Sequence, residues 1–464
     1  MAEQMIQHKE GEKVATQAIP AGFKWTEIGI IPEDWIIEKL GMYASFRTGP
    51  FGSALHKSDY VIDGIPIVNP MQIIDGGIIP TSSMSISTTA ATKLSEFRLQ
   101  TGDIVIGRRG EMGRCAVVGI EENGWLCGTG SMIIRIKSSC ESRFIQRVLS
   151  SKEIIAAIES SSVGTTMINL NQSTLRELKI FIPSNKNEQL AIATVLSDTD
   201  ALIGELEQLV AKKQGIKTAA MQQLLTGRTR LPQFALRPDG TPKGYKSSEL
   251  GQIPEDWEIK TIYELADYQK FLFDDGDWVE AEHITDHGTR LIQTGNIGIG
   301  RYVEKENKKY ISDASFDKLK CKLLQEGDLL ICRLAEPAGR ACILPNIGES
   351  KVITSVDVSI FRPSKKTAYR DFYNQYFSFS EWFKTVLEQV GGTTHKRIAR
   401  GALGRLPVPY PKLEEQTAIA TILSDMDSEL SSLEQKLAKA RSLKQGMMQQ
   451  LLTGRIRLPL PQEA

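Results

Sequence analysis

The 464-residue chain has no apolar run long enough to cross a membrane, since a spanning helix needs about 20 such residues. Its first residues, MAEQMIQHKEGEKVATQ, are polar and mixed in charge, and they lack the apolar core of a signal peptide. The 56 basic residues are balanced by 56 acidic ones, which excludes a protein that coats nucleic acid by bulk positive charge. These absences predict a cytoplasmic protein without a membrane partner.

Cysteine and histidine are scarce, with six and five residues. No two cysteines form a C-x-x-C pair, and a disulfide framework needs a smaller and denser chain. His283 and His287 stand four residues apart, but no cysteine pair accompanies them. We therefore expect reduced cysteines and no metal site.

Complete catalytic motifs are also missing. The G-x-G sequences at Gly128 and Gly298 do not extend to G-x-G-x-x-G, and neither a P-loop nor an H-E-x-x-H motif occurs. The sequence predicts no catalytic residue, so an enzymatic function would need a partner that brings the chemistry.

What the chain does contain is an internal duplication. The segments 188–232 and 415–459 are identical at 27 of 45 positions without a gap. A shorter pair, GFKWTEIGIIPEDW from Gly22 and GYKSSELGQIPEDW from Gly244, is identical at 9 of 14 positions. The chain therefore consists of two tandem halves, and each half runs from a lead-in through a variable body to a long shared segment.

The two bodies, about 36–185 and 258–412, are much less alike than the segments that flank them. A sparse skeleton is common to both: a Gly-Asp pair, an arginine, a Gly-Arg pair and a closing Gly-Thr-Thr. This layout indicates a fixed structural frame that holds two bodies with different recognition surfaces.

Each long shared segment has an a/d pattern sustained for more than four heptads, which predicts a long helix. The glycine of LLTG, Gly227 or Gly454, is typical of a helix C-terminus. Lys213, Lys217 and Lys444 also occupy seam positions, where they weaken a two-helix seam and can face a third surface. The apolar residues of the predicted helix-pair seam are Ile192, Leu196, Ile203, Leu206, Val210, Leu224, Ile419, Leu423, Leu430, Leu433, Leu437 and Leu451.

Two such seams in one chain can cover each other, most simply as an antiparallel pair. The alternative is that each helix packs separately on its own domain, but two strict and continuous seams favour pairing. A helix of about 38 residues is roughly 57 Å long. A paired rod of that length would hold the two bodies one to two turns of duplex DNA apart.

Basic residues gather between glycines in GRRGEMGR, in CRLAEPAGR and in HKRIARGALGR. Arginine can form bidentate hydrogen bonds with guanine or with a phosphate, and glycine lets the backbone approach DNA closely. For Arg108 and Arg333, placed alike in both bodies, structural support and phosphate contact are both open; for the last cluster we favour DNA contact. The candidate DNA-binding residues are Arg108, Arg109, Arg114, Arg333, Arg340, Lys396, Arg397, Arg400 and Arg405.

Trp35 and Trp257 end the two IPEDW lead-ins. A tryptophan repeated in both halves can stack on a base, but such a residue more often anchors the edge of a domain in its core. We expect the anchoring role.

The order and duplication of these motifs resemble one family, the specificity subunits of Type I restriction-modification systems. The resemblance is carried by the IPEDW lead-ins, the L-x-x-G-D stretches at Leu99 and Leu324, the G-T-T body ends, the E-Q-x-A-I-A helix starts and the M-Q-Q-L-L-T-G helix ends. It covers about 22–460. The first body departs from the second at its end, where TTMINLNQ lacks the basic residues of THKRIARG.

The resemblance implies that each body is a target recognition domain that reads one half of a split, asymmetric site in double-stranded DNA. It implies that the helices set the gap and dock two modification subunits, which carry S-adenosylmethionine and methylate adenine N6. Two restriction subunits, where present, would use ATP and Mg to translocate and cut DNA. This chain would then hold no cofactor and perform no catalysis.

The predicted fold class is α+β: two globular α/β recognition domains joined by two long helices in an antiparallel coiled coil, with a pseudo-twofold duplication. Two other functions stay open: a coiled-coil scaffold without DNA recognition, and a self-contained DNA methyltransferase or nuclease. The predicted segments are a flexible tail (1–21), recognition domain 1 (22–185), helix 1 (186–230), linker and second lead-in (231–256), recognition domain 2 (257–412), helix 2 (413–456) and a C-terminal tail (457–464).

Overall fold

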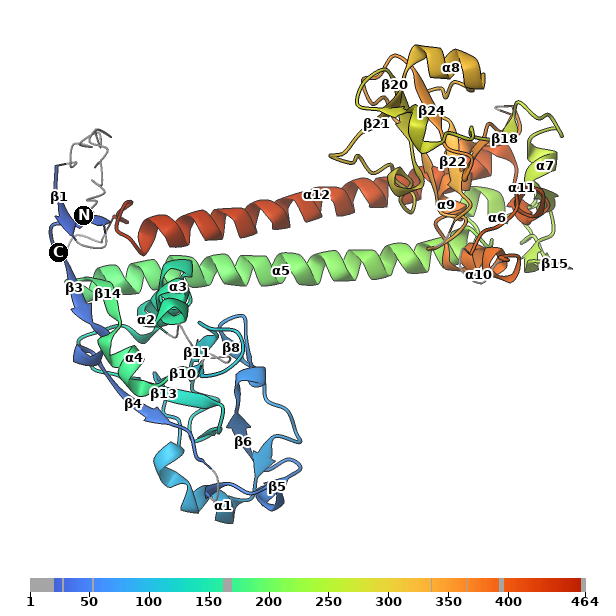
Figure 1. The fold of residues 1–464 in the computed structure, drawn as a ribbon. Helices are drawn as coiled ribbons and strands as arrows, with labels where there is room; N and C mark the ends of the chain where they lie inside the picture. Colours follow the sequence, from blue (N-terminus) through green and yellow to red (C-terminus); the bar gives the residue numbers. More distant parts are fainter. Residues whose placement is uncertain are drawn as a thin grey trace, which may run out of the picture. The chain divides into compact units, whose positions relative to one another are not determined.

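The structure, a computed structural model, describes residues 21–26, 29–51, 54–161, 169–334, 336–364, 366–391 and 396–459. The chain divides into two compact units (Figure 1). Unit 1 comprises Met1–Leu206 with Lys436–Ala464, and unit 2 comprises Glu207–Gln435. Each unit therefore contains one body together with the nearer part of both long helices, a division that the linear segments of the sequence do not reveal.

The body of unit 1 is built from two four-stranded sheets. The antiparallel first sheet has the order β11-β10-β13-β4, and the second has the order β12-β6-β9-β5, in which β12 runs parallel to β6. Their strands are β4 (Ala44–Thr48), β5 (Tyr60–Val61), β6 (Ile65–Val68), β9 (Ser85–Ile86), β10 (Ile104–Gly107), β11 (Cys115–Val117), β12 (Leu126–Cys127) and β13 (Ser131–Ile136).

Shorter elements complete unit 1. A lead-in hairpin precedes the body, and β3 pairs with β14 where the body begins and ends. These elements are β1 (Phe23–Thr26), β2 (Gly29–Pro32), β3 (Trp35–Lys39), β7 (Ile73–Ile74), β8 (Gly77–Ile78), β14 (Lys179–Pro183), α1 (Thr88–Lys93), α2 (Ser142–Leu149), α3 (Lys152–Ser160) and α4 (Gln172–Glu177).

The body of unit 2 repeats this plan. Its first sheet has the order β18-β25-β22-β23, and its second has the order β19-β21-β20-β24 with β20 parallel to β24. The strands are β18 (Phe273–Asp275), β19 (Ile284–Thr285), β20 (Thr289–Ile292), β21 (Lys309–Ile311), β22 (Leu329–Cys332), β23 (Ala341–Ile343), β24 (Val352–Thr354) and β25 (Val358–Phe361). Two bodies of dissimilar sequence thus share one topology.

The smaller elements of unit 2 also match those of unit 1, since a hairpin leads in and β17 pairs with β26. They are α6 (Pro232–Ala235), β15 (Tyr245–Ser248), β16 (Gly251–Pro254), β17 (Glu258–Thr261), α7 (Ile262–Leu265), α8 (Asp313–Leu319), α9 (Arg370–Tyr376), α10 (Ser380–Glu388), α11 (Arg400–Gly404) and β26 (Pro407–Tyr410).

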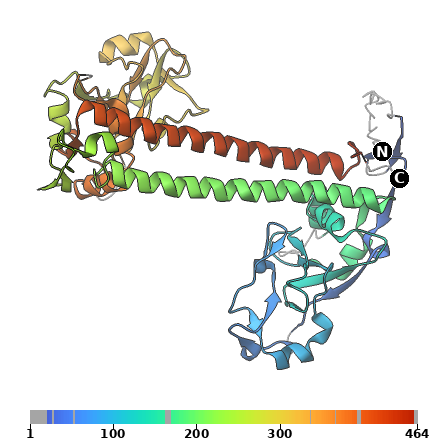
Figure 2. The same ribbon diagram turned by 180° about the vertical axis from the view of Figure 1, so that it is seen from behind.

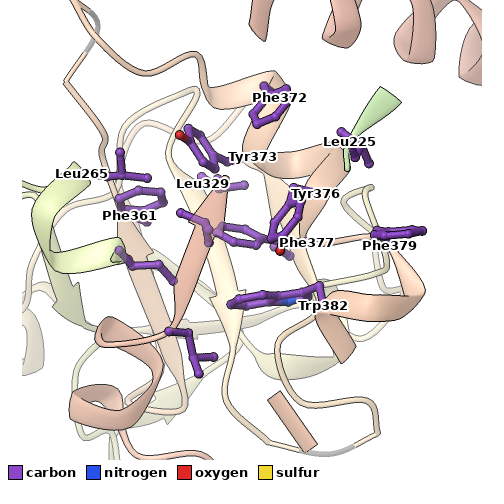
Figure 3. Close-up of a cluster of buried hydrophobic side chains, with 14 of the residues drawn as sticks. Leu225, Leu265, Leu329, Phe361, Phe372, Tyr373, Tyr376, Phe377, Phe379 and Trp382 are labelled. Carbon is purple, nitrogen blue, oxygen red and sulfur yellow. The ribbon is translucent and has the colours of Figure 1, made fainter. Parts of the chain in front are cut away.

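Aromatic side chains fill the core of unit 2 (Figure 3). Phe377 lies against Trp382 with ring centres 4.5 Å apart, and Phe361 contacts both Tyr373 and Phe377. These residues come from β25, α9 and α10 and the turn between the helices, so the core fixes the helices against the first sheet. The corresponding core of unit 1 is mainly aliphatic, with Trp35 and Phe144 as its buried aromatic residues.

The long helices are α5 (Lys186–Leu224) and α12 (Leu413–Leu451), each 39 residues long. Within unit 1, Ile192 and Leu196 near the start of α5 pack with Leu451 at the end of α12. Within unit 2 the opposite ends meet, and Leu224 packs with Ile419 and Leu423. The predicted antiparallel pairing is confirmed, and both views show the helices side by side (Figures 1 and 2). The predicted seam residues are buried or half-buried, whereas their neighbours are mostly exposed.

The lysines in the seam were expected to weaken it and to face a third surface, but each of them pairs with the partner helix instead of a third surface. Lys217 forms an ion pair with Asp427 of the partner helix in unit 2, and Lys444 forms the equivalent pair with Asp200 in unit 1 at 2.5 Å. Lys213 also crosses to the partner helix. A carboxylate opposite each lysine compensates the charge and fixes the register of the pair.

Three motifs shared by the halves meet in unit 2. Arg230, just beyond α5, donates hydrogen bonds to Asp256 of the lead-in at 2.8 and 3.4 Å and to Glu415 of α12 at 2.6 and 2.7 Å. Trp257 is buried and donates its Nε1–H to Glu415 at 3.0 Å. Gly227 has a φ of +69°, and a Cβ there would lie 2.5 Å from Pro254. This cluster joins the end of one helix, the lead-in and the start of the other helix.

Unit 1 contains the same junction. Arg457 donates hydrogen bonds to Asp34 at 2.8 and 2.9 Å and to Glu188 of α5. Trp35 is fully buried, which confirms the anchoring role expected for both lead-in tryptophans. Gly454 again has a φ of +69° and leaves no room for a Cβ beside Pro32. The shared motifs are therefore junction residues of the frame.

The structure refines the predicted segment boundaries. Helices α5 and α12 end about five residues before the predicted limits of 230 and 456. The linker at 231–256 contains α6 and the β15–β16 hairpin. The first residue of the C-terminal tail, Arg457, is held in unit 1 by its hydrogen bond to Asp34. All but one residue of the predicted N-terminal tail lie outside the described part.

The six cysteines are free of disulfide bonds, as expected, and all but the half-buried Cys321 are buried. No helix in the described ranges is both long and apolar enough to cross a membrane. The same described residues contain no group of three or more side chains suited to hold a metal ion.

Candidate nucleic-acid interface

Arg108 and Arg333 serve the frame of each body. The Arg108 Nε–H donates to the carbonyl of Leu170 at 2.9 Å, and the N–H of Leu170 donates back to the Arg108 carbonyl. Arg333 and Ile398 make the equivalent pair of contacts. Only 6% and 2% of these arginines is exposed, and burial lowers the pKa of both guanidinium groups. Each arginine thus ties the first sheet to the segment that closes the body, so of the two open roles the structure shows structural support.

The Gly-Asp pairs of the skeleton have a structural role too. Asp103 accepts two hydrogen bonds from Arg135 at 2.8 Å, and Asp328 binds Arg362 in the same bidentate way. These contacts cross neighbouring strands of the first sheet and raise the pKa of both arginines. The residues that the two bodies share are therefore the ones that hold the sheet together.

Arg340 and Arg114 occupy matching positions but differ in their partners. Arg340 donates to four backbone carbonyls at 2.8–3.0 Å, including those of Thr294 and Ile297. Its guanidinium group is therefore used to hold the neighbouring loop. Arg114 donates to one backbone carbonyl, that of Pro70 at 3.4 Å, forms an ion pair with Glu111 at 2.5 Å and remains about one-third exposed. DNA contact is thus left open for Arg114 more than for Arg340.

The remaining predicted residues lie closer to the surface. Arg109, Lys396 and Arg405 are exposed. Arg397 pairs with Asp357 at 3.1 Å, and Arg400 pairs with Asp274, so acidic side chains from elsewhere in the body face this cluster. Acidic partners compensate the charges of Arg397 and Arg400, and DNA contact by these five residues stays a prediction. The Gly-Thr-Thr ends of the bodies lie outside the described residues.

The comparisons with known proteins assign the chain to a family. The family profile "Type I restriction modification DNA specificity domain" matches residues 50–218 and 254–440, which is more than half of the chain. The chain belongs to this family. Each match covers one body and most of the helix that follows it, so the sequence unit of this specificity-domain family is a body with its own long helix.

Relatives of this specificity-domain chain occur in Methanocaldococcus jannaschii. It is 28% identical over 445 residues to a protein provisionally named the type I restriction enzyme MjaX specificity subunit, covering 94% of this chain and 97% of the relative. It is 24% identical over 434 residues to the type I restriction enzyme MjaVIII specificity subunit, covering 92% and 94%. The alignment thus extends over both halves of each protein.

A solved structure shares the fold of this specificity-domain chain. The type I restriction-modification S subunit from M. genitalium matches with a TM-score of 0.56 and 16% identity, over 90% of this chain and 96% of that one. The two halves predicted from the duplication, the long helices predicted from the heptad pattern and the family that the motifs resemble are therefore confirmed at the level of family and fold.

Proposed function

We propose that the chain is the DNA-specificity subunit of a Type I restriction-modification complex, in which each body binds one half of a bipartite, asymmetric site in double-stranded DNA. The observation that carries the proposal is that the two bodies keep one frame while their other residues differ. Arg108 and Arg333, and Asp103 and Asp328, make the same contacts in both bodies. A common frame with divergent surfaces suits two readers of different base sequences.

The long helices set the unread gap between the half-sites and dock two modification subunits. In support of this role, each helix begins in one unit and ends in the other, and its 39 residues amount to roughly 58 Å. Away from the helix starts, which pack against the bodies, exposed apolar residues such as Leu202, Leu209 and Leu443 lie outside the seam and are available to other proteins.

The chemistry belongs to the partners. The modification subunits bind S-adenosylmethionine and methylate adenine N6, and restriction subunits, where present, use ATP and Mg to move and cut DNA. This chain selects the DNA sequence that the complex binds and performs no catalysis. The absence of a complete catalytic motif from the sequence supports this division.

The experiment compares adenine methylation across the genome of a host that expresses this chain with its neighbouring modification subunit and of a host that lacks the chain. We expect a new N6-methyladenine motif in two parts with a fixed gap. An assembled complex that produces no new motif would favour the coiled-coil scaffold without DNA recognition. Methylation by the purified chain alone would favour a self-contained methyltransferase.

A further inference from the structure

The two bodies can be matched residue by residue at the ends of β4 and β18. Gly49 follows β4 and donates its N–H to the carbonyl of Ser131 at 3.0 Å, and Gly276 follows β18 and donates to Val358 at 2.9 Å. Ser131 and Val358 are equivalent because β13 and β25 pair with β10 and β22 in the same register. A Cβ on either glycine would lie only 1.9 or 2.3 Å from a backbone oxygen, so the chain passes close to the second sheet at this point in both bodies.

Two residues beyond each glycine stands an exposed aromatic side chain. Phe51 is 53% exposed in the first body, and Trp278 is 65% exposed in the second. A single exposed apolar residue is ordinary on a protein surface. The repetition is informative, because the exposed aromatic recurs at the equivalent place in two bodies that share little sequence beyond their frame.

The ring of Phe51 lies beside the guanidinium group of Arg108 in the first body. The guanidinium carbon of Arg108 is 5.1 Å from the centre of its ring, a distance at which a cation attracts the ring face. Arg109, the next residue, is exposed. The ring is therefore held by a buried arginine while an adjacent arginine remains accessible.

Trp278 occupies the equivalent place in the second body, where acidic residues flank it in the sequence. Its Nε1–H donates to Glu280 at 3.2 Å. Three residues earlier, Asp275 contacts Arg333 at 3.1 Å and Arg400 at 3.8 Å, so these two arginines are paired with a carboxylate at the end of the preceding strand. The exposed aromatic side chain is therefore common to both bodies, whereas a guanidinium group against its ring is described in the first body alone.

We infer that Phe51 and Trp278 contact bases of the target DNA, one in each half-site, and that they add affinity and base preference there. An exposed aromatic ring can make apolar contact with a base edge in duplex DNA, such as the methyl group of thymine, and in the first body the exposed Arg109 can neutralise phosphate. The inference rests on the proposed function and extends it, since the arginines of the frame make structural contacts and leave the base-reading residues unassigned.

The test uses the assembled complex with its modification subunits and a duplex that contains the mapped bipartite site. Phe51→Ala and Trp278→Ala should each weaken binding by about 5- to 100-fold, while the slope of log affinity against log salt stays unchanged because no phosphate contact is lost. Phe51→Tyr and Trp278→Phe should keep most of the affinity. Tryptophan fluorescence quenching on DNA binding should decrease in Trp278→Phe and persist in Trp25→Phe.

Two exposed residues serve as matched controls: Ile120 in the first body is 85% exposed, and Trp25 in the lead-in hairpin is 68% exposed. Ile120→Ala and Trp25→Ala should bind like the wild type. Wild-type affinity in both Phe51→Ala and Trp278→Ala, or a loss accompanied by a lower salt slope, would overturn the inference. Failure of the wild-type complex itself to bind a bipartite site would instead contradict the proposed function.

Discussion

Arg230 shows what a single side chain does in this frame. Its guanidinium group bridges Asp256 and Glu415, and Glu415 is almost completely buried. A buried carboxylate without a cationic partner carries a large desolvation cost. Arg230 therefore stabilises the meeting point of α5, the lead-in and α12, and Arg457 does the same in unit 1.

Replacement of Arg230 by alanine should destabilise unit 2 by about 3–5 kcal/mol, because it leaves Glu415 buried and unpaired. Thermal and urea unfolding of the purified protein would measure the loss. Arg237→Ala in the same unit is the matched control, since Arg237 and its partner Glu255 are both partly exposed and such pairs contribute at most about 1 kcal/mol. Equal effects of the two substitutions would contradict the assigned role.

The same cluster predicts a dependence on pH. Partial burial raises the pKa of Asp256, but the hydrogen bonds from Arg230 and Lys243 outweigh it and hold the pKa at about 2. Because the folded pKa lies below the unfolded value of about 3.9, this stabilisation is present above pH 4 and is lost as the pH falls to 2, by about 2 kcal/mol in total. Urea midpoints measured from pH 5 to pH 2 should fall more steeply for the wild type than for Asp256→Asn. Parallel curves would disprove the contribution of Asp256.

The sequence predicted which arginines matter but not what they contact. Arg108 binds Leu170, 62 positions further along the chain, so no local pattern could distinguish a frame contact from a phosphate contact. Phe51 and Trp278 escaped notice for the same reason. Their equivalence depends on strand register, and a comparison of the two bodies at fixed spacing from Gly49 and Gly276 is the signal that could have revealed them.

At the scale of elements, the long helices were the most predictable part, because a heptad pattern depends only on residues that are close together in the sequence. Their ends at Leu224 and Leu451 follow from the glycines three residues later, Gly227 and Gly454, which adopt a positive φ. The ion pair that compensates Lys217 was not predictable, since Asp427 lies on the other helix. The strands of the second sheets are only two to four residues long, too short to show a periodicity.

The spacer role predicts how the helices respond to a change in length. Insertion of one heptad after Leu206 and another after Leu433 keeps the a/d phase in both helices and adds about 10 Å to each. The gap in the methylated motif should then increase by roughly three base pairs. Methylome mapping reads the gap directly, and the half-site sequences should stay the same. An unchanged gap in a folded, active complex would refute the spacer role.

At the scale of the whole chain, the duplication determines the division into units. Unit 1 takes its last segment from Lys436–Ala464, so the second half of the sequence completes the unit that the first half begins. The duplication was visible in the sequence, but this exchange was not, because it depends on antiparallel helix contacts such as that of Asp200 with Lys444. Because the two bodies share one topology, we expect them to be interchangeable parts of one frame.

This interchangeability predicts the symmetry of an altered target. Residues 258–412, between the second lead-in and α12, can be replaced by residues 36–185, which gives a chain with two identical readers. In the proposed assembly the antiparallel helices would relate identical recognition domains by a twofold axis, and a twofold protein binds an inverted repeat. The methylated motif should therefore become a palindrome built from the first half-site, with the gap unchanged. The motif is read from the methylome of a host that expresses the altered chain. A direct repeat would contradict the pseudo-twofold arrangement. Retention of the original second half-site would show that residues outside 258–412 bind the bases.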